Sequence, residues 1–255
     1  MMEIEAPTRV FWAPGCTSCL RTKEFLTRMG IPFESVNVAA DPGAMEALRA
    51  LGARSVPIVS QGSRYVYAQS IADVKAFLKL DVADDERLPP AELARRLNVI
   101  LTGAMRYASQ MSDETLDGPF LNSWAPPRGL AHHVFRVTEA FLETREQNIE
   151  LGYDLIMQGT HEVEPGQDVV GYGADVLRRF NDWWAANSDS DWSSQVPTYY
   201  GDQTLHEVFE RTTWHSAQHT RQLMFVLETI GTPIDRPLTK DDLAGLPLPE
   251  RAWDA

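Results

Sequence analysis

The sequence has only two cysteines in 255 residues, Cys16 and Cys19, and they lie three positions apart. A secreted fold built on disulfides needs more cysteines at wider spacings, so this close pair indicates redox chemistry instead. No apolar run approaches the roughly 18 residues that a membrane span needs, and residues 1–7 lack the basic and apolar pattern of a signal peptide. We therefore expect a cytoplasmic protein with no membrane partner.

Basic side chains are scarce as well. The chain has 23 Lys and Arg against 36 Asp and Glu, a formal net charge of −13. Binding of nucleic acid requires clustered cationic side chains, and no Lys/Arg-rich block interrupts the acidic balance. We therefore expect no nucleic-acid partner. The hydrophobic content of 44% is that of an ordinary globular protein with a core.

Residues 8–80 alternate between strand and helix patterns. The predicted strands are Arg9–Trp12, Phe33–Val38, Val56–Val59 and Tyr65–Tyr67, and the predicted helices are Cys16–Met29, Asp41–Leu51 and Ile71–Leu80. The resulting β-α-β-α-β-β-α order predicts a central sheet covered by helices. We assign residues 1–80 to this α/β domain.

Strand patterns fade after residue 90. The acidic stretch 81–90 ends in a proline pair and is interpreted as a linker. Helical patterns follow at 91–111, 128–152, 168–187 and 204–230. Four such helices predict an all-α four-helix bundle over residues 91–255, with the proline-rich tail 231–255 lying over it as an extended strap.

The cysteine pair lies at the predicted junction between the first strand and the first helix. Unpaired N–H groups and the helix dipole stabilise a thiolate at Cys16, and Cys19, one turn later, can resolve a mixed disulfide formed there. Zinc knuckles share this spacing, but a zinc site needs two further ligands, and residues 1–80 contain no second cysteine pair and no histidine. Redox chemistry is favoured over metal binding or inert thiols.

Val56-Pro57 starts a predicted strand about 40 residues after the cysteines. A cis peptide bond there would expose a backbone edge beside the thiols, where a thiol substrate could pair. The alternative is a proline that merely starts a strand.

Together these features resemble the glutaredoxin branch of the thioredoxin superfamily over residues 8–80. The resemblance rests on Cys16-Thr17-Ser18-Cys19, on Lys23 in the next helix and on Val56-Pro57. It implies a thioredoxin-like fold, with Cys16 as nucleophile, Cys19 as resolving thiol and Pro57 as the cis-proline. The sequence departs from the usual Cys-Pro-Tyr-Cys motif and has Ala68-Gln69-Ser70 where the family has a Gly-Gly pair. That pair normally helps to hold glutathione.

The histidines suggest a second site. On a helix at 100° per residue, His219 lies about 40° from His215, inside the arc of apolar side chains, and His133 borders the core face of its own helix. His132 points about 100° away from that face but competes with His133 as a third ligand. His206 is expected to be solvated. Two histidines four apart and a third from a neighbouring helix can hold one metal ion; the alternative is three core-edge histidines satisfied by hydrogen bonds.

The segments Trp214–Leu223 and Leu130–Val134 resemble the metal-binding helices of the DinB/YfiT-like bundle superfamily. The resemblance implies a divalent metal on His133, His215 and His219, with zinc favoured over nickel, iron and manganese. Members include S-transferases and isomerases that use mycothiol, bacillithiol or glutathione. It therefore implies a small thiol and an electrophilic or disulfide substrate as partners, and these bundles often form homodimers.

The predicted function is thiol–disulfide redox chemistry coupled to a metal-dependent site of the thiol-transferase type. The alternatives are a redox or metal sensor without turnover, and a plain dithiol oxidoreductase with a structural bundle. For Trp183, Trp184 and Trp192, packing is favoured over a substrate platform. Arg211 and Arg221 could bind a substrate carboxylate, but surface salt bridges are the favoured interpretation.

Overall fold

The computed structural model describes residues 6–83, 86–121 and 123–253. The chain divides into two compact units, one formed by Met1–Asp85 with Pro249–Ala255 and the other by Glu86–Leu248. We call them the α/β unit and the helical unit. Among the described helices, none combines the length and apolarity that crossing a bilayer requires.

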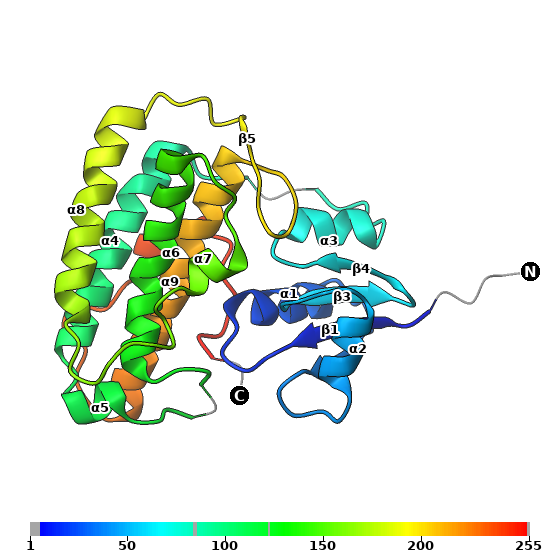
Figure 1. Ribbon diagram of the computed structural model, residues 1–255, viewed down its shortest axis with the longest axis horizontal. Helices are drawn as coiled ribbons and strands as arrows, with labels where there is room; N and C mark the ends of the chain where they lie inside the picture. Colours follow the sequence, from blue (N-terminus) through cyan, green and yellow to red (C-terminus); the bar gives the residue numbers. More distant parts are fainter. Residues whose placement is uncertain (1–5, 84–85, 122, 254–255) are drawn as a thin grey trace, which may run out of the picture. The chain divides into compact units, whose positions relative to one another are not determined.

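The α/β unit contains a four-stranded mixed sheet (Figure 1). Its elements follow the predicted order: β1 Thr8–Trp12, α1 Thr17–Arg28, β2 Glu34–Asn37, α2 Ala44–Ala50, β3 Ile58–Gln61, β4 Arg64–Tyr67 and α3 Ile71–Phe77. The strand order is β2-β1-β3-β4; β1 pairs in parallel with β2, and the other pairings are antiparallel. This is a thioredoxin-like α/β arrangement, as the sequence predicts.

The sheet has an apolar core on each face, because successive strand residues point to opposite sides. Val10 lies in one core with Val59 and with side chains of α1 and α3. Phe11 lies in the other with Ile58 and with side chains of α2. Burial of both faces fixes the register of β1, since a slip of one residue would exchange the two sets.

Three predicted boundaries differ from the structure at positions with special backbone geometry. The second helix begins at Ala44 rather than Asp41, because Gly43 takes a left-handed conformation with φ of 73°. The helix predicted to reach residue 152 ends at Gln147, because Asn148 caps it with φ of 52°. The third strand begins at Ile58, after a cis Val56–Pro57 peptide bond.

Four long helices form the helical unit (Figure 1). They are α4 Pro90–Ser109, α6 Pro127–Gln147, α8 Val169–Asn187 and α9 Leu205–Thr229. Helices α4 and α6 each pack against both α8 and α9, so the four surround a common core. A capping box formed by Thr204 and Glu207 starts α9. The four predicted helices are therefore found.

Short elements that the sequence patterns did not reveal lie between the long helices and after the last of them. They are α5 Asp113–Asp117, α7 Tyr153–Met157, the paired strands β5 Gln195–Val196 and β6 Gln203–Thr204, and α10 Lys240–Leu243. Each has five residues or fewer, too short for a periodic hydrophobic pattern to develop.

The tail covers α4, but its last residues belong elsewhere. The Tyr107 hydroxyl contacts the Arg236 carbonyl at 3.0 Å, and Arg96 donates to the Asp241 carbonyl. The backbone N–H of Glu250 instead donates to the Glu24 carboxylate of α1 at 2.6 Å. Pro249–Ala255 thus belongs to the α/β unit. The expectation that the whole tail to residue 255 lies over the bundle is wrong for these residues.

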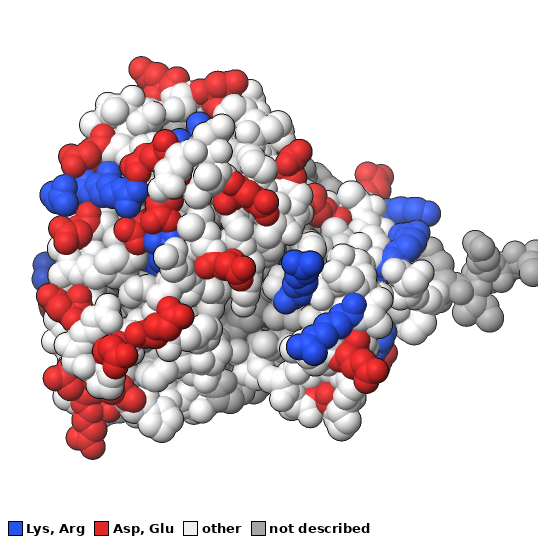
Figure 2. Space-filling model, viewed as in Figure 1, with Lys and Arg blue, Asp and Glu red and all other residues white. Residues whose placement is uncertain are grey.

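Acidic side chains dominate the surface of the helical unit. Residues 86–248 contain 24 Asp and Glu and 13 Lys and Arg, so this unit carries most of the negative charge of the chain. Figure 2 shows acidic groups spread over the visible face of the unit. An anion that binds to this unit therefore needs a local cation to attract it.

Candidate functional site

The two cysteines form a disulfide at the start of α1. Their sulfur atoms are bonded, and Cys16 is the N-cap residue of the helix, with its Sγ accepting from the Cys19 N–H at 3.2 Å. Cys16 is partly exposed, whereas Cys19 is completely buried. An incoming thiol can therefore reach Cys16. Cys19 lies in the interior, where it can attack a mixed disulfide formed at Cys16.

The backbone that was predicted to pair with a thiol substrate is held by a side chain that the sequence did not single out as functional. The Gln69 amide donates to the Val56 carbonyl at 3.1 Å, and the Ala68 N–H donates to the Pro57 carbonyl at 2.9 Å. The Thr22 hydroxyl of α1 lies 3.2 Å from the Ala68 carbonyl. These bonds connect α1, just after the cysteines, with the Val56-Pro57 segment through residues 68 and 69.

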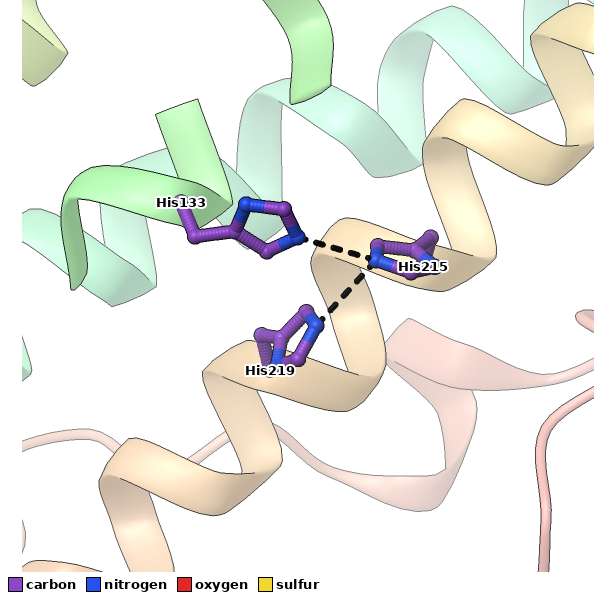
Figure 3. Close-up of side chains that lie close together, drawn as sticks. All are labelled: His133, His215 and His219. Atoms are coloured by element: carbon purple, nitrogen blue, oxygen red, sulfur yellow. Dashed lines mark hydrogen bonds between the residues drawn. The ribbon is translucent and has the colours of Figure 1, made fainter. Parts of the chain in front are cut away.

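Three histidines lie together in the helical unit. Figure 3 shows His133 from α6 and His215 and His219 from α9 with their rings turned toward one another. The Nε2 atom of His215 lies 3.3 Å from that of His133 and 3.1 Å from that of His219, and one ligand atom from each ring lies within 4.8 Å of the others. The structure therefore brings the three predicted ligands together.

The outer nitrogens of two of these rings contact other side chains. His219 Nδ1 lies 2.7 Å from the Gln222 Oε1, which can only accept, so Nδ1 carries the proton and Nε2 presents its lone pair. His133 Nδ1 lies 3.4 Å from the Thr160 hydroxyl. Such outer contacts fix the tautomer and the direction of a metal-ligating histidine.

The three Nε2 atoms do not satisfy one another when the rings are neutral. His219 Nε2 is an acceptor. If His215 Nε2 carries a proton, it can donate that proton to only one of its two close neighbours, His133 Nε2 or His219 Nε2. If His133 donates to His215 instead, the lone pairs of His215 and His219 face each other. A cation shared by three lone pairs removes this conflict, and tetrahedral bonds of 2.0–2.1 Å imply nitrogen separations of about 3.3 Å. The residues present thus fit a metal ion.

Burial keeps these imidazoles neutral. The loss of solvation lowers the pKa of His219 to about 4, despite its bond to Gln222, and lowers the pKa of His133 and His215 well below 6.5. The positive charge of Arg211 contributes in the same direction at all three rings. Neutral imidazole is the form that binds metal.

Trp124 borders the cluster on one side. Its indole ring makes edge contacts with His133 and His219, at ring-centre distances of 5.3 and 6.2 Å, and with the exposed His161 at 5.5 Å. Neither Trp124 nor His161 was singled out from the sequence, because both lie outside the long helices, where no periodicity assigns them a face.

Two other histidines differ from their predicted environments. His132 was expected to point away from the core, but it is buried and stacks on Tyr172 with ring centres 4.8 Å apart, because α8 packs against this side of α6. It faces away from the three-histidine cluster, so His133 is the residue that meets His215 and His219. His206 was expected to be solvated, but it is partly buried, with its Nε2 2.8 Å from the Leu88 carbonyl.

Arg211 of α9 departs from the expected surface position. It is 5% exposed and donates to the Tyr199 hydroxyl. Arg221 is partly buried and donates to the Gln218 side chain at 2.6 Å. The tryptophans do pack: Trp184 and Trp192 both stack on Phe209.

Comparison with known proteins bears on the α/β unit. The family model described as Glutaredoxin matches residues 9–66. The N-terminal region is a glutaredoxin domain. The glutaredoxin-like protein NrdH of Escherichia coli K12 is 45% identical over 47 residues, which are 18% of this chain and 58% of that protein. The NrdH protein of Salmonella typhimurium is 38% identical over 53 residues, 21% of this chain and 65% of that protein.

A phage protein is similar as well. The Gene 56 protein of Mycobacterium phage L5 is 44% identical over 55 residues, covering 21% of this chain and 53% of the phage protein. The chain thus spans about half the length of the curated relatives it matches. No solved structure matches significantly. The glutaredoxin domain supports thiol redox function at the disulfide that joins Cys16 and Cys19.

Proposed function

We propose that this chain couples thiol–disulfide exchange in its glutaredoxin domain to a metal-dependent site for a small thiol in its helical unit. The observation that supports the metal-dependent site is the convergence of three buried imidazole nitrogens. Neutral rings cannot give all three of these nitrogens a hydrogen-bond partner within the cluster. The resemblance of these helices to DinB-like bundles supports the same assignment. Zinc is the favoured ion, because neutral imidazoles in a compact set suit it.

The exchange reaction follows from the unequal exposure of the two sulfurs. In the reduced domain the Cys16 thiolate attacks a disulfide, forms a mixed disulfide and releases one thiol. The Cys19 thiolate then attacks Cys16 Sγ, releases the second thiol and leaves the intramolecular disulfide seen in the structure. Two electrons pass to the substrate, and a thiol or dithiol reductant must restore the pair.

In the helical unit, His133, His215 and His219 would hold the ion, with Gln222 and Thr160 orienting two of the rings. A bound divalent cation lowers the pKa of a thiol that binds to it, which supplies a thiolate at neutral pH. Three protein ligands leave a position for such a thiol. Trp124 shields the rings from water on one side. The thiolate would then attack a small electrophile.

Metal content tests the ligand assignment. We expect the purified full-length protein to contain about one divalent ion per chain, as fits one three-nitrogen set, and His215→Ala and His219→Ala to lose most of it. His206→Ala is the matched control on the same helix and should keep the ion. Elemental analysis measures all four proteins. An equal metal content in wild type and both cluster variants would refute the site.

Thiol consumption tests the activity. Metal-loaded protein is incubated with a panel of small thiols and electrophiles, and we expect consumption that His215→Ala lacks. Reduction of a low-molecular-weight disulfide is measured in parallel. If metal removal leaves disulfide reduction intact, and no thiol is consumed by either protein, the transferase-type function is excluded and a plain dithiol oxidoreductase remains.

A further inference from the structure

Arg211 shares a helix face with two of the clustered histidines. It precedes His215 by four residues and His219 by eight, so the three side chains leave α9 within about 80° of one another. Four residues along a helix correspond to about 6 Å. Arg211 is 5% exposed, and an arginine is rarely buried in a protein unless its guanidinium is paired.

Aromatic side chains hold this guanidinium in place. Arg211 Nη2 donates to the Tyr199 hydroxyl at 3.3 Å, and its Cζ atom lies 5.3 Å from the centre of the Tyr200 ring. The ring of Tyr199 also contacts that of Tyr153, which is 42% exposed. Aromatic surface therefore extends from the buried guanidinium to the surface of the helical unit.

The loop that carries these tyrosines is anchored to the fold. The Leu151 N–H donates to the Pro197 carbonyl at 3.0 Å, and the Tyr199 N–H donates to the Leu151 carbonyl at 3.2 Å. Leu151 is 1% exposed, so the loop is tied to the interior. The tyrosines that contact the guanidinium are therefore fixed in position. A binding group must be held in this way to recognise one arrangement of ligand atoms.

The charge of Arg211 reaches the histidine cluster. Arg211 lies one helical turn before His215 on the same face of α9, so its charge is close to the rings of the cluster. In a unit with a large excess of acidic side chains, it is a local cation close to the proposed metal site. A planar guanidinium can bind a carboxylate through two parallel N–H bonds.

We propose that Arg211 binds the carboxylate of an acidic thiol whose sulfur occupies the neighbouring metal site. The inference rests on the proposed function and names its ligand class: a short thiol with a carboxylate a few bonds from sulfur. On binding, the thiol gives up its proton to the solvent, and the carboxylate remains ionised. The thiolate then lies beside the metal ion, and the carboxylate lies beside the guanidinium of Arg211.

The test compares two thiols of equal length. Full-length protein loaded with Co²⁺ is titrated with 3-mercaptopropionate and with its amide, and the thiolate-to-cobalt absorption band gives both dissociation constants. We expect the wild type to bind the carboxylate at least tenfold more tightly than the amide. Arg211→Gln should abolish that preference while binding the amide as the wild type does. Arg211→Lys, which keeps the charge but not the two-bond geometry, should show a reduced preference.

The controls separate the possible failures. Arg178→Gln removes a largely exposed arginine of α8 and should leave the preference unchanged. Equal affinity of the wild type for the two thiols overturns the role of Arg211 but not the metal site. If neither thiol perturbs the cobalt spectrum, the proposed function fails, and this inference fails with it. The wild-type comparison alone decides the matter if the Arg211 variants do not fold.

Discussion

Gln69 holds the backbone next to Pro57 through a side-chain hydrogen bond. It is 4% exposed, and its amide donates to the carbonyl of Val56, the residue before Pro57. Loss of the donor to a fully buried acceptor costs roughly 1–3 kcal/mol, and Val56 is partly buried, so the cost here is at the lower end. The bond therefore holds the segment that we expect to pair with a thiol substrate, without direct contact between Gln69 and the sulfur atoms.

We predict that Gln69→Leu weakens substrate binding by the glutaredoxin domain. Loss of the bond lets the Val56 edge move, so KM for a small disulfide should rise about tenfold, about 1.4 kcal/mol, with kcat nearly unchanged. Steady-state disulfide reduction measures both constants. Gln61→Leu is the control, because Gln61 donates to Thr8 elsewhere in the sheet. A fall in kcat with constant KM would assign Gln69 to the chemical step instead.

For single residues, the sequence predicts the environment of a side chain correctly where helical periodicity determines it. The prediction fails where contacts from distant segments determine it. The 100° offset between His132 and His133 correctly separated the residue that faces His215 from the one that does not. Burial of His132 was missed, because it depends on the stacking partner Tyr172, 40 positions away. The role of Gln69 was missed for the same reason: the sequence shows only that it replaces a glycine.

Helices α6 and α8 approach closely at one glycine. A Cβ atom on Gly173 would lie 2.5–2.8 Å from three ring atoms of Phe135, which is completely buried. A ring in a packed core cannot retreat by that distance without moving its neighbours. By contrast, a Cβ on Gly103 of α4 would meet side chains at 3.4–3.6 Å, an ordinary contact distance.

The same substitution should therefore have opposite effects at the two positions. Alanine favours a helix over glycine by about 1 kcal/mol, which should raise the stability of Gly103→Ala. At Gly173 the overlap with Phe135 should outweigh that gain and lower the free energy of unfolding by about 1–3 kcal/mol. Urea unfolding followed by circular dichroism compares the variants. A stabilised Gly173→Ala would mean that α8 can shift away from α6.

The long helices could be predicted from the sequence, but the residues at which they end could not. The four long helices were predictable because each has enough turns to display an apolar face. The end of α6 was predicted five residues late, since Asn148 continues an acceptable helical pattern and only its left-handed conformation ends the helix. Hydrophobic patterns show which face is buried, but they do not show where the backbone leaves the helix.

On the scale of the whole chain, the α/β unit is built from both ends of the sequence. The Glu24 carboxylate accepts from the N–H groups of Glu250 and Arg251, and Arg251 also approaches it with its guanidinium at 3.5 Å. These partners are more than 220 positions apart, so no local pattern could relate them. Sequence alone assigned the tail to the unit that precedes it along the chain.

The buried histidines make the stability of the metal-free protein depend on pH. In the unfolded chain each has a pKa near 6.5, whereas burial lowers the folded values, to about 4 for His219. Below about pH 6.5 the unfolded chain therefore binds protons that the folded chain does not, and acidification favours unfolding. Each such histidine contributes about 1.4 kcal/mol per pH unit within this window.

We predict that the free energy of unfolding of metal-free protein falls between pH 6.5 and pH 5, and that His219→Gln reduces the slope by about 1.4 kcal/mol per pH unit. Every other titrating group is present in both proteins, so the difference reports His219 together with its electrostatic effect on the pKa of His133 and His215. Urea unfolding in chelator at several pH values measures it. Bound metal should shift the loss of stability to lower pH, since protons must displace the ion before they can occupy its ligands. Equal slopes for the two proteins would show that His219 is protonated equally in the folded and unfolded chains. That result would contradict the argument that the folded protein keeps His219 neutral and able to bind a metal ion.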